Sequence, residues 1–310
     1  MKIALLFPGQ GSQSTGMLQT LAAQYPQVEE RFRQASAVLK QDLWAISQDD
    51  SQSYLLNQTS ITQPILLAAG MACYDILQAE TGVSGDFFAG HSLGEYTALC
   101  ASGALGFEKA IELVHTRGTL MQEAVGRDEG AMAAILGLED KDVLAACDRA
   151  GGEVSAANFN APGQVVIAGR TAAVERAIAL AKEMGARKAV RLPVSVPSHC
   201  PLMRAAAAQL GGYLDNIRWQ KPKAPLVYNV DGQLRDSCDG TVALLGAQLY
   251  RPVLWSSCIE TLKKAGATLF IELGPNRVLA GLNKRIDKGL PTYTLDSPEA
   301  LQEIKNALGA

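Results

Sequence analysis

Residues 87–99 read FFAGHSLGEYTAL, and this stretch joins an apolar run to a helix-forming run through a turn that is rich in glycine. The apolar run, Phe87 to Ala89, has the composition of a short buried strand. The turn at residues 90–94 matches the pattern G-x-S-x-G with Ser92 at its centre, and residues 95–99 favour a helix. A strand, a sharp turn and a helix in this order are typical of a nucleophile elbow, which exposes a serine on a strained backbone. We therefore interpret Ser92 as a catalytic nucleophile, with an ordinary strand-to-helix turn as the alternative.

The regions on either side of this stretch repeat the alternation of strand and helix. Residues 3–7 form an apolar run that stops at Pro8-Gly9, as a buried strand would. Further strands are expected over residues 86–90, 226–230 and 268–273, and helices over residues 17–39, 65–80, 107–124 and 252–265. Strands separated by helices indicate an α/β fold with a parallel sheet.

Residues 126–196 have a different order of elements. Strands are expected over residues 131–138, 154–158, 165–168 and 187–194, and helices over residues 140–150 and 172–184. The order βαββαβ is that of the split, ferredoxin-like unit. The sequence therefore predicts a large α/β domain made of residues 1–125 and 197–310, with residues 126–196 inserted as a smaller ferredoxin-like domain.

A serine hydroxyl needs a neighbouring group that accepts its proton, and the chain has three histidines. His91 adjoins Ser92, so its side chain should point elsewhere and support the site from behind. His115 lies within a helical run and is expected to be packed or on the surface. His199 follows residues 194–198, a proline-containing loop of the kind that can aim a side chain. We expect His199 to be the base, with a structural loop histidine as the alternative; no acidic partner stands out, and a backbone carbonyl could orient the ring instead.

Bulk composition argues against several classes of function. The 310 residues carry a net charge of -3 and 6% aromatic residues, which disfavours nucleic acid as a partner. No apolar run approaches the roughly 18 residues that a membrane span needs. The cysteines form no C-x-x-C pair and the histidines lie far apart, so we expect reduced thiols, no metal site and a cytoplasmic location.

Six motifs, taken in order, carry a family resemblance. They are FPGQGSQ at residues 7–13, GHSLGEY at 90–96, Arg117, ANFNAPGQ at 157–164, VPSH at 196–199 and QLYRPV at 248–253. The chain closely resembles the bacterial malonyl-CoA:acyl carrier protein transacylases of type II fatty acid synthesis, from Phe7 to about Val278. Each motif alone is weak, but their shared order and spacing make the set specific.

The resemblance implies a hydrolase-like α/β domain with a ferredoxin-like insert and an active site in the cleft between them. Matched motif by motif, it implies that Ser92 is the nucleophile, His199 the base, Arg117 the ligand of the substrate carboxylate, Gln10 and Leu93 the oxyanion hole through their backbone N–H groups, and Gln248 the backbone carbonyl that holds the histidine. A guanidinium suits a carboxylate because it donates two parallel charge-assisted hydrogen bonds. Without the resemblance, Arg117 would be interpreted as a helix-surface residue, Gln10 as a polar loop residue and Gln248 as a helix surface or cap.

The reaction implied by the resemblance moves malonyl from malonyl-CoA to the phosphopantetheine thiol of acyl carrier protein, through a malonyl-Ser92 ester and with ping-pong kinetics. No cofactor is implied, and we expect a monomer. Carrier proteins are acidic and this chain is mildly acidic, so docking needs a local basic patch. Two candidate patches are Arg187, Lys188 and Arg191, and Lys284 with Arg285, and ordinary solvated charge is the alternative for each.

Three rival functions use parts of the same machinery. A serine esterase or thioesterase would share the elbow and the base, but it has no need of Arg117. A non-catalytic acyl-binding or CoA-binding protein has no need of Ser92 and His199 together. A sister transferase for another acyl group, such as methylmalonyl, would differ only in pocket shape, which the sequence does not reveal.

Overall fold

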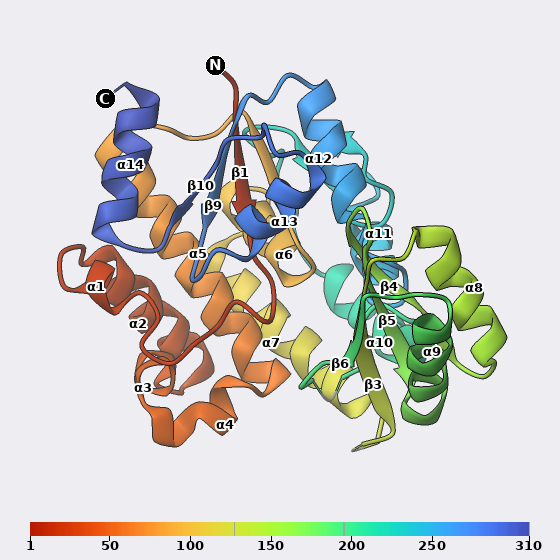
Figure 1. The fold of residues 1–310 in the computed structure, drawn as a ribbon. Helices are drawn as coiled ribbons and strands as arrows, with labels where there is room; N and C mark the ends of the chain where they lie inside the picture. Colours follow the sequence, from red (N-terminus) through yellow and green to blue (C-terminus); the bar gives the residue numbers. More distant parts are fainter. Residues whose placement is uncertain (127, 195, 310) are drawn as a thin grey trace.

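The computed structural model describes residues 1–126, 128–194 and 196–309, drawn as a ribbon in Figure 1. The elements are arranged around two separate sheets, one largely parallel and one antiparallel. The α/β class that the sequence predicts is therefore confirmed. Ser195, in the loop expected before His199, lies outside the described residues.

The larger sheet has the strand order β10-β9-β1-β2-β7-β8. Its strands are β1 (Ile3–Phe7), β2 (Phe87–Gly90), β7 (Leu226–Val227), β8 (Leu234–Arg235), β9 (Leu269–Leu273) and β10 (Thr292–Leu295). Neighbours run parallel except β7 and β8. The strand expected over residues 226–230 ends earlier, because a turn closed by Gly232 N–H and the Tyr228 carbonyl (2.9 Å) follows Val227. The apolar pattern does not predict β10, whose TYTL sequence has no continuous apolar run.

The helices of the large unit are α1 (Gln19–Ala22), α2 (Gln27–Leu39), α3 (Leu43–Gln48), α4 (Ser53–Leu56), α5 (Thr59–Thr81), α6 (Leu93–Ala101), α7 (Phe107–Glu123), α10 (Arg204–Leu214), α11 (Thr241–Gln248), α12 (Trp255–Lys264), α13 (Val278–Ile286) and α14 (Pro298–Leu308). The helix expected over residues 17–39 is interrupted before α2, because Pro26 disfavours helical backbone at the residue that precedes it. The helix expected over residues 252–265 starts only at Trp255, because Val253 pairs with a strand of the smaller sheet instead.

Helices cover both faces of the larger sheet, because successive side chains of a strand point to opposite faces. On one face Leu5 and Phe7 pack in a core that includes α5, and on the other Ala4 and Leu6 pack with α12 and α13. By length and composition α5 could cross a membrane, but 89% of its most apolar window is buried inside the protein. We therefore interpret α5 as a core helix.

The smaller sheet comes from the segment predicted to be an insert. Its elements are β3 (Gly130–Leu136), α8 (Asp140–Ala150), β4 (Val154–Ala161), β5 (Gln164–Arg170), α9 (Thr171–Glu183) and β6 (Lys188–Arg191). The strands pair antiparallel in the order β4-β5-β3-β6, as a βαββαβ unit requires. The domain limits stay a prediction, since only the element order bears on them.

The two faces of the smaller sheet have different surroundings. Ala131, Ala133 and Ile135 of β3 pack against α8 and α9, which lie on the side away from the large unit in Figure 1. Met132, between them in sequence, packs in a separate cluster with Val166. Because side chains alternate along a strand, one face of the sheet packs into the core that it forms with α8 and α9. The other face is free to form a wall of the space between the two sheets.

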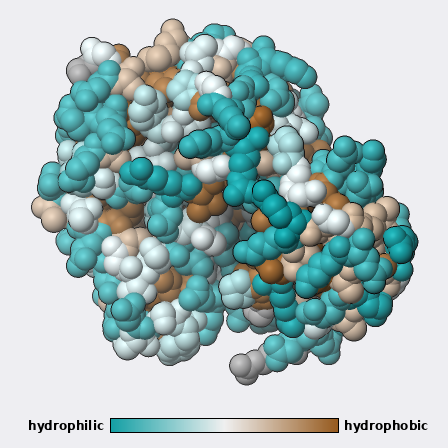
Figure 2. All heavy atoms as spheres, in the orientation of Figure 1, coloured by the Kyte–Doolittle hydropathy of each residue, from teal (hydrophilic) through white to brown (hydrophobic). Residues whose placement is uncertain are grey.

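A short backbone bridge joins the smaller sheet to the large unit. Val253 N–H donates to the Ala157 carbonyl, and Phe159 N–H donates to the Val253 carbonyl, both at 2.9 Å. This bridge fixes the edge of β4 beside the segment that leads into α12. The space-filling view shows the face hollowed between the two units, with hydrophobic side chains around the hollow (Figure 2).

Candidate active site

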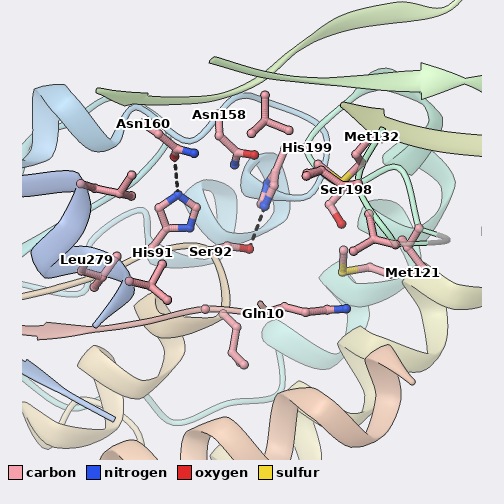
Figure 3. A pocket seen from close by; sticks show the side chains of 18 of the residues that line it. Gln10, His91, Ser92, Met121, Met132, Asn158, Asn160, Ser198, His199 and Leu279 are labelled. Carbon is pink, nitrogen blue, oxygen red and sulfur yellow. Dashed lines mark hydrogen bonds between the residues drawn. The ribbon is translucent and has the colours of Figure 1, made fainter. Parts of the chain in front are cut away.

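A pocket of about 230 Å³ lies between the two sheets. Its polar lining includes Ser92, His199 and Arg117, while Met132 and Val166 come from the smaller sheet. Figure 3 shows Ser92 and His199 facing each other across this space. The pocket therefore brings together three residues that lie far apart in the sequence and that the sequence predicts to share a site.

The Ser92 turn has the backbone strain expected of a nucleophile elbow. Ser92 follows β2 and precedes α6, with φ 54 and ψ -110, a conformation that L-residues rarely adopt. The residues two positions before and after Ser92 must be glycine, because a side chain there would collide with the backbone. A Cβ on Gly90 would lie 1.9 Å from the Gly94 carbonyl, and a Cβ on Gly94 would lie 1.9 Å from the Phe7 oxygen. The G-x-S-x-G pattern is thus explained by close backbone packing on both sides of the serine.

His199 is held so that one ring nitrogen faces the serine. Its Nε2 lies 2.7 Å from Ser92 Oγ, and its Nδ1 lies 2.7 Å from the backbone carbonyl of Gln248. A carbonyl accepts only, so Nδ1 carries the proton and Nε2 is the acceptor for the hydroxyl. The backbone carbonyl occupies the place that an acidic residue takes in a Ser-His-Asp triad.

Burial keeps the His199 ring neutral. Removal from water, followed in importance by the nearby Arg117 charge, lowers the pKa of His199 to about 3. Loss of solvent disfavours the imidazolium, and the guanidinium repels it. The ring is therefore unprotonated at neutral pH and able to accept a proton. An anion that neutralised Arg117 would raise the pKa of His199 and make it a stronger base.

Arg117 is a buried cation at the floor of the site. Only 1% of its surface is exposed, although it lies on α7. Its Nη1 donates to Gln63 Oε1 (2.8 Å), and its Nη2 donates to Gln248 Oε1 (2.9 Å) and to Ser92 Oγ (3.3 Å). Two neutral amides hold the guanidinium without neutralising it, so its charge is available to an anionic ligand beside Ser92.

Gln10 and Leu93 also line the pocket. Leu93 is the first residue of α6, and the first N–H groups of a helix have no partner within the helix. Gln10 follows β1, and its side chain reaches Thr59 at the start of α5 (3.4 Å). Two backbone segments from neighbouring parallel strands thus converge on the serine. That arrangement could stabilise an oxyanion, and the roles of both residues remain predictions.

Four amide side chains of the site were not singled out from the sequence as functional residues. Asn160 Oδ1 lies 2.8 Å from His91 Nε2, so the ring of the residue before Ser92 is bonded to the smaller sheet. Asn158 lines the pocket next to it, Gln63 supports the guanidinium, and Asn229 contacts the Ser92 backbone. The ANFNAPGQ motif drew attention to the first two. For Gln63 and Asn229 the sequence contains no comparable signal.

The remaining predicted residues lie outside the centre of the site. His115 Nδ1 lies 2.9 Å from the Ser60 carbonyl, away from Ser92. Lys284 and Arg285 are exposed on α13, whose Leu279 lines the pocket. Arg187, Lys188 and Arg191 are exposed at and beside β6, and Arg191 lines a second hollow that Gln10 also borders. Within residues 1–126, 128–194 and 196–309, no three His, Cys, Asp or Glu side chains gather as metal ligands would.

Comparison with known proteins gives a consistent result. The family described as "Acyl transferase domain" matches residues 4–295. The "Malonyl CoA-acyl carrier protein transacylase" of Escherichia coli strain K12 is 48% identical over 302 residues, which is 97% of each chain. The corresponding protein of Bacillus subtilis strain 168 is 41% identical and covers 97% of this chain and 95% of its own.

Solved structures agree in fold. The malonyl CoA-acyl carrier protein transacylase of Coxiella burnetii superposes with a TM-score of 0.97 at 44% identity, covering 100% of this chain and 98% of that one. A malonyl-transacylase in complex with its type II PKS acyl-carrier protein superposes with a TM-score of 0.96 at 45% identity, covering 100% of both chains. The hydrolase-like fold with a small antiparallel insert is therefore shared by relatives across the full length.

Proposed function

The chain belongs to the acyl transferase domain family, and on that premise we propose that it moves malonyl from malonyl-CoA to the phosphopantetheine thiol of an acyl carrier protein in fatty acid biosynthesis. The acyl group is carried between the two thiols as an ester of Ser92. The names of the relatives support this donor and this acceptor.

One observation supports the proposal above the others. Ser92 Oγ lies between a neutral imidazole, 2.7 Å away, and a buried guanidinium, 3.3 Å away. The imidazole of His199 can take the hydroxyl proton, and the guanidinium of Arg117 can bind an acyl group that ends in a carboxylate. An unsubstituted acyl group would leave the buried charge of Arg117 without a counterion. The site therefore suits an acyl group that ends in a free carboxylate, as malonyl does.

In the first half-reaction, the malonyl carboxylate pairs with Arg117 and places the thioester carbonyl beside Ser92. His199 takes the Ser92 proton at Nε2 as the hydroxyl oxygen attacks the carbonyl carbon. The N–H groups of Gln10 and Leu93 stabilise the oxyanion, a contribution on the order of 3–4 kcal/mol in comparable sites. His199 then returns the proton to the departing thiolate, and coenzyme A leaves.

In the second half-reaction, the carrier-protein thiol enters the pocket in place of coenzyme A. His199 takes the thiol proton, the sulfur attacks the ester carbonyl, and Ser92 leaves and recovers its proton. A thioester is exchanged for a thioester, so the two half-reactions together are nearly isoenergetic. The shared covalent intermediate predicts ping-pong kinetics.

Docking of the carrier protein requires positive charge near the pocket mouth. Arg285 donates to Gln164 Oε1 (2.8 Å), and Gln164 lines the pocket. Helix α13 therefore brings Lys284 and Arg285 to the rim of the pocket. We propose this pair as the principal docking patch, with Arg187, Lys188 and Arg191 at β6 as the second. Reversing both charges at Lys284 and Arg285 should raise the KM for the carrier protein and leave loading from malonyl-CoA unchanged. Lys109→Glu on α7 is the matched control.

The proposed cellular setting follows from the same chemistry. All six cysteines are free thiols, which suits a reducing cytoplasm. The steps above need no cofactor, because proton transfer and acyl transfer are performed by side chains and backbone. We propose that the enzyme works as a monomer, since the pocket is formed within one chain.

Intact-protein mass spectrometry with a panel of acyl-CoAs tests the proposal. Malonyl-CoA should add one malonyl group to the wild type, and the adduct should persist until carrier protein is added. In Arg117→Ala, malonyl loading should fall by about 100-fold or more while acetyl loading is retained or increases. Rapid loss of the adduct to water without carrier protein would indicate a thioesterase. The absence of any adduct on Ser92 would refute the proposed function.

A further inference from the structure

The backbone of the nucleophile is held by a side chain that does not line the pocket. Ser92 N–H donates to Asn229 Oδ1 at 2.7 Å, and Asn229 Nδ2 donates to the Gly90 carbonyl at 2.7 Å. One fully buried amide thus spans the backbone that leads into the strained residue, from the Gly90 carbonyl to the Ser92 N–H. A side-chain amide accepts at its oxygen and donates at its nitrogen, whereas a carboxylate lacks the donor and an alkyl group lacks both.

Asn229 is placed by the larger sheet. It follows β7, which pairs in parallel with β2 through Leu226 and Val227. The carboxyl ends of adjacent parallel strands share one edge, so the residue after β7 meets the turn after β2. The Asn229 backbone is fixed as well, because its N–H donates to Glu95 Oε2 (2.6 Å) and its carbonyl accepts from Leu254 N–H (2.9 Å).

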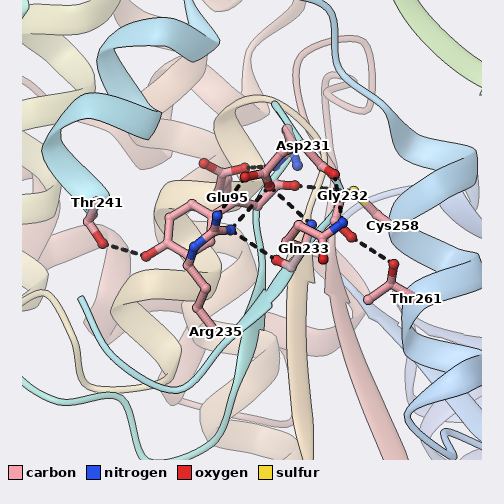
Figure 4. Close-up of polar contacts among 10 residues, drawn as sticks. Glu95, Asp231, Gly232, Gln233, Arg235, Thr241, Cys258 and Thr261 are labelled. Atoms are coloured by element: carbon pink, nitrogen blue, oxygen red, sulfur yellow. Dashed lines mark hydrogen bonds and ion pairs between the residues drawn. The ribbon is translucent and has the colours of Figure 1, made fainter. Parts of the chain in front are cut away.

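The loop that carries Asn229 is anchored along its length, as Figure 4 shows. Arg235 Nη2 donates to Asp231 Oδ2 at 2.6 Å, and Thr261 Oγ1 donates to the Gly232 carbonyl at 2.7 Å. The hydroxyl of Tyr228 pairs with Thr241 on α11. A loop held at this many points gives Asn229 little freedom to follow a shift of Ser92, so the constraint acts on the serine.

A second buried amide completes the hold on the serine. Gln248 Nε2 donates to the Ser92 carbonyl at 3.0 Å, while Gln248 Oε1 accepts from Arg117 and the Gln248 backbone carbonyl accepts from His199. The N–H and C=O of Ser92 are therefore both occupied by side-chain amides. Asn229 holds the backbone on the N-terminal side of the residue with positive φ, and Gln248 holds its C-terminal side.

We propose that Asn229 is a positioning residue for acyl transfer, which holds Ser92 in its strained conformation so that Oγ stays in reach of His199 and the Leu93 N–H points into the pocket. It acts through the Ser92 backbone and does not touch the substrate. Because Asn229 occupies the Ser92 N–H, that group is unable to stabilise the oxyanion, which leaves the task to the neighbouring N–H. The inference rests on the proposed acyl-Ser92 function.

The test compares Asn229→Ala and Asn229→Asp with the wild type in single-turnover loading from malonyl-CoA, followed by quenched intact-protein mass spectrometry. Asn229→Ala should lower the rate of acyl-Ser92 formation about 100-fold, since a displacement near 1 Å of a reacting group costs about that much. The malonyl-CoA concentration at half-saturation should change less than about 3-fold, because Arg117 is untouched. Asn229→Asp keeps the acceptor for Ser92 N–H and loses the donor to Gly90, so its rate should fall by about 10-fold.

Ser102→Ala is the matched control. It removes a buried hydrogen bond from the Ser102 hydroxyl to the Leu99 carbonyl (3.0 Å), which lies at the far end of α6, outside both the pocket and the Asn229 loop, so it should lower the unfolding temperature and leave the loading rate unchanged. Wild-type loading by folded Asn229→Ala would overturn the proposal. If that variant does not fold, wild-type loading by Asn229→Asp would overturn it equally. A wild type that takes up no malonyl would instead refute the proposed function.

Discussion

The two walls of the pocket differ in chemistry. The wall built on the larger sheet contributes groups that can react or carry charge, namely the half-buried Ser92 and the buried His199 and Arg117. The wall built on the smaller sheet contributes Met132 and Val166, with the neutral amides of Asn158 and Asn160 beside them. In the proposed mechanism the first wall performs the reaction, and the second gives the pocket its shape.

Sheet topology explains this division. In a parallel sheet the carboxyl ends of the strands meet at one edge, so the residues after β1, β2 and β7 converge with their free backbone groups. The antiparallel sheet offers a flat face on which alternate side chains point into the pocket while the others fill its own core. Changes in the first wall should therefore alter rates by orders of magnitude, and changes in the second should alter fit.

The largest effect is expected from Ser92→Ala. Removing the nucleophile should abolish the acyl adduct and lower turnover by a factor of about 10⁵ to 10⁶. Ser102→Ala is the control, because Ser102 Oγ donates to the Leu99 carbonyl at the far end of α6 and lies outside the pocket. Turnover would be measured as coenzyme A release in the presence of carrier protein. Residual turnover above about 1% would mean that another group carries the acyl chain.

A smaller effect is expected where the two walls touch. Asn160→Ala removes the partner of His91 Nε2, which lies 2.8 Å away, and leaves a buried ring nitrogen without a hydrogen bond. We expect a loss of stability of about 1–3 kcal/mol and acyl-Ser92 formation slowed by about 10-fold, because His91 adjoins the nucleophile. Urea unfolding and single-turnover loading would measure the two quantities. An unchanged loading rate would show that this contact only joins the walls.

The Ser92 turn could be predicted from the sequence because close backbone packing allows only glycine at two fixed positions around the serine. Glycine at positions 90 and 94 is required by neighbouring backbone atoms, so the pattern survives as a local signal. The partners of the serine are different, because they come from distant segments. Asn229 and Gln63 reach the site only through the pairing of β7 with β2 and the packing of α5 against α7. A polar residue placed by tertiary structure leaves no periodic trace in its own segment.

The fold shows the same contrast between local and distant causes. Strands rich in apolar residues, such as β1 and β9, could be predicted because both of their faces are buried. The start of α12 could not be predicted, because Val253 is drawn into backbone pairing with Ala157 and Phe159, which lie almost a hundred residues earlier. Sequence patterns thus describe an element reliably until another part of the chain competes for its backbone.

A selectivity change is expected from the wall that gives the pocket its shape. Met132→Ala should enlarge the space for the acyl chain and raise the loading of methylmalonyl relative to malonyl by about 5-fold, since one methyl group in an apolar pocket is worth roughly 1–3 kcal/mol. Ile135→Val is the control, because Ile135 lies on the same strand and faces α8 and α9 instead. Both would be measured by competitive loading with the two acyl-CoAs. If Ile135→Val changed the ratio of methylmalonyl to malonyl loading equally, the effect would come from the stability of the sheet and not from the shape of the pocket.

The smallest effect concerns the pH dependence of the free energy of unfolding, through two buried carboxyl groups of the large unit. Burial raises the pKa of the Glu95 carboxyl on α6 to about 8, and that of the Glu272 carboxyl on β9 to about 7. The folded protein therefore holds these protons more tightly than the unfolded chain does. The stability that each contributes is fully present below its unfolded pKa and is lost as the pH rises through the folded value. Burial lowers the pKa of His199 and His91, so their contributions change only below about pH 6.5.

Glu95→Gln tests this loss by comparison with the wild type between pH 7 and 8, because the other titrating groups, Glu272 and the cysteines among them, are common to both proteins. Glutamine keeps an oxygen to accept the Asn229 N–H but has no proton to lose. The wild type should therefore lose up to about 1.4 kcal/mol more unfolding free energy per pH unit than the variant in this window. Urea unfolding in steps from pH 7.0 to 8.5 measures the slopes, and Glu272→Gln, which should flatten the curve nearer pH 7, is the matched comparison. Identical slopes in the wild type and Glu95→Gln would mean that Glu95 is already ionised at pH 7, and that the reactive wall tolerates a buried negative charge beside Asn229.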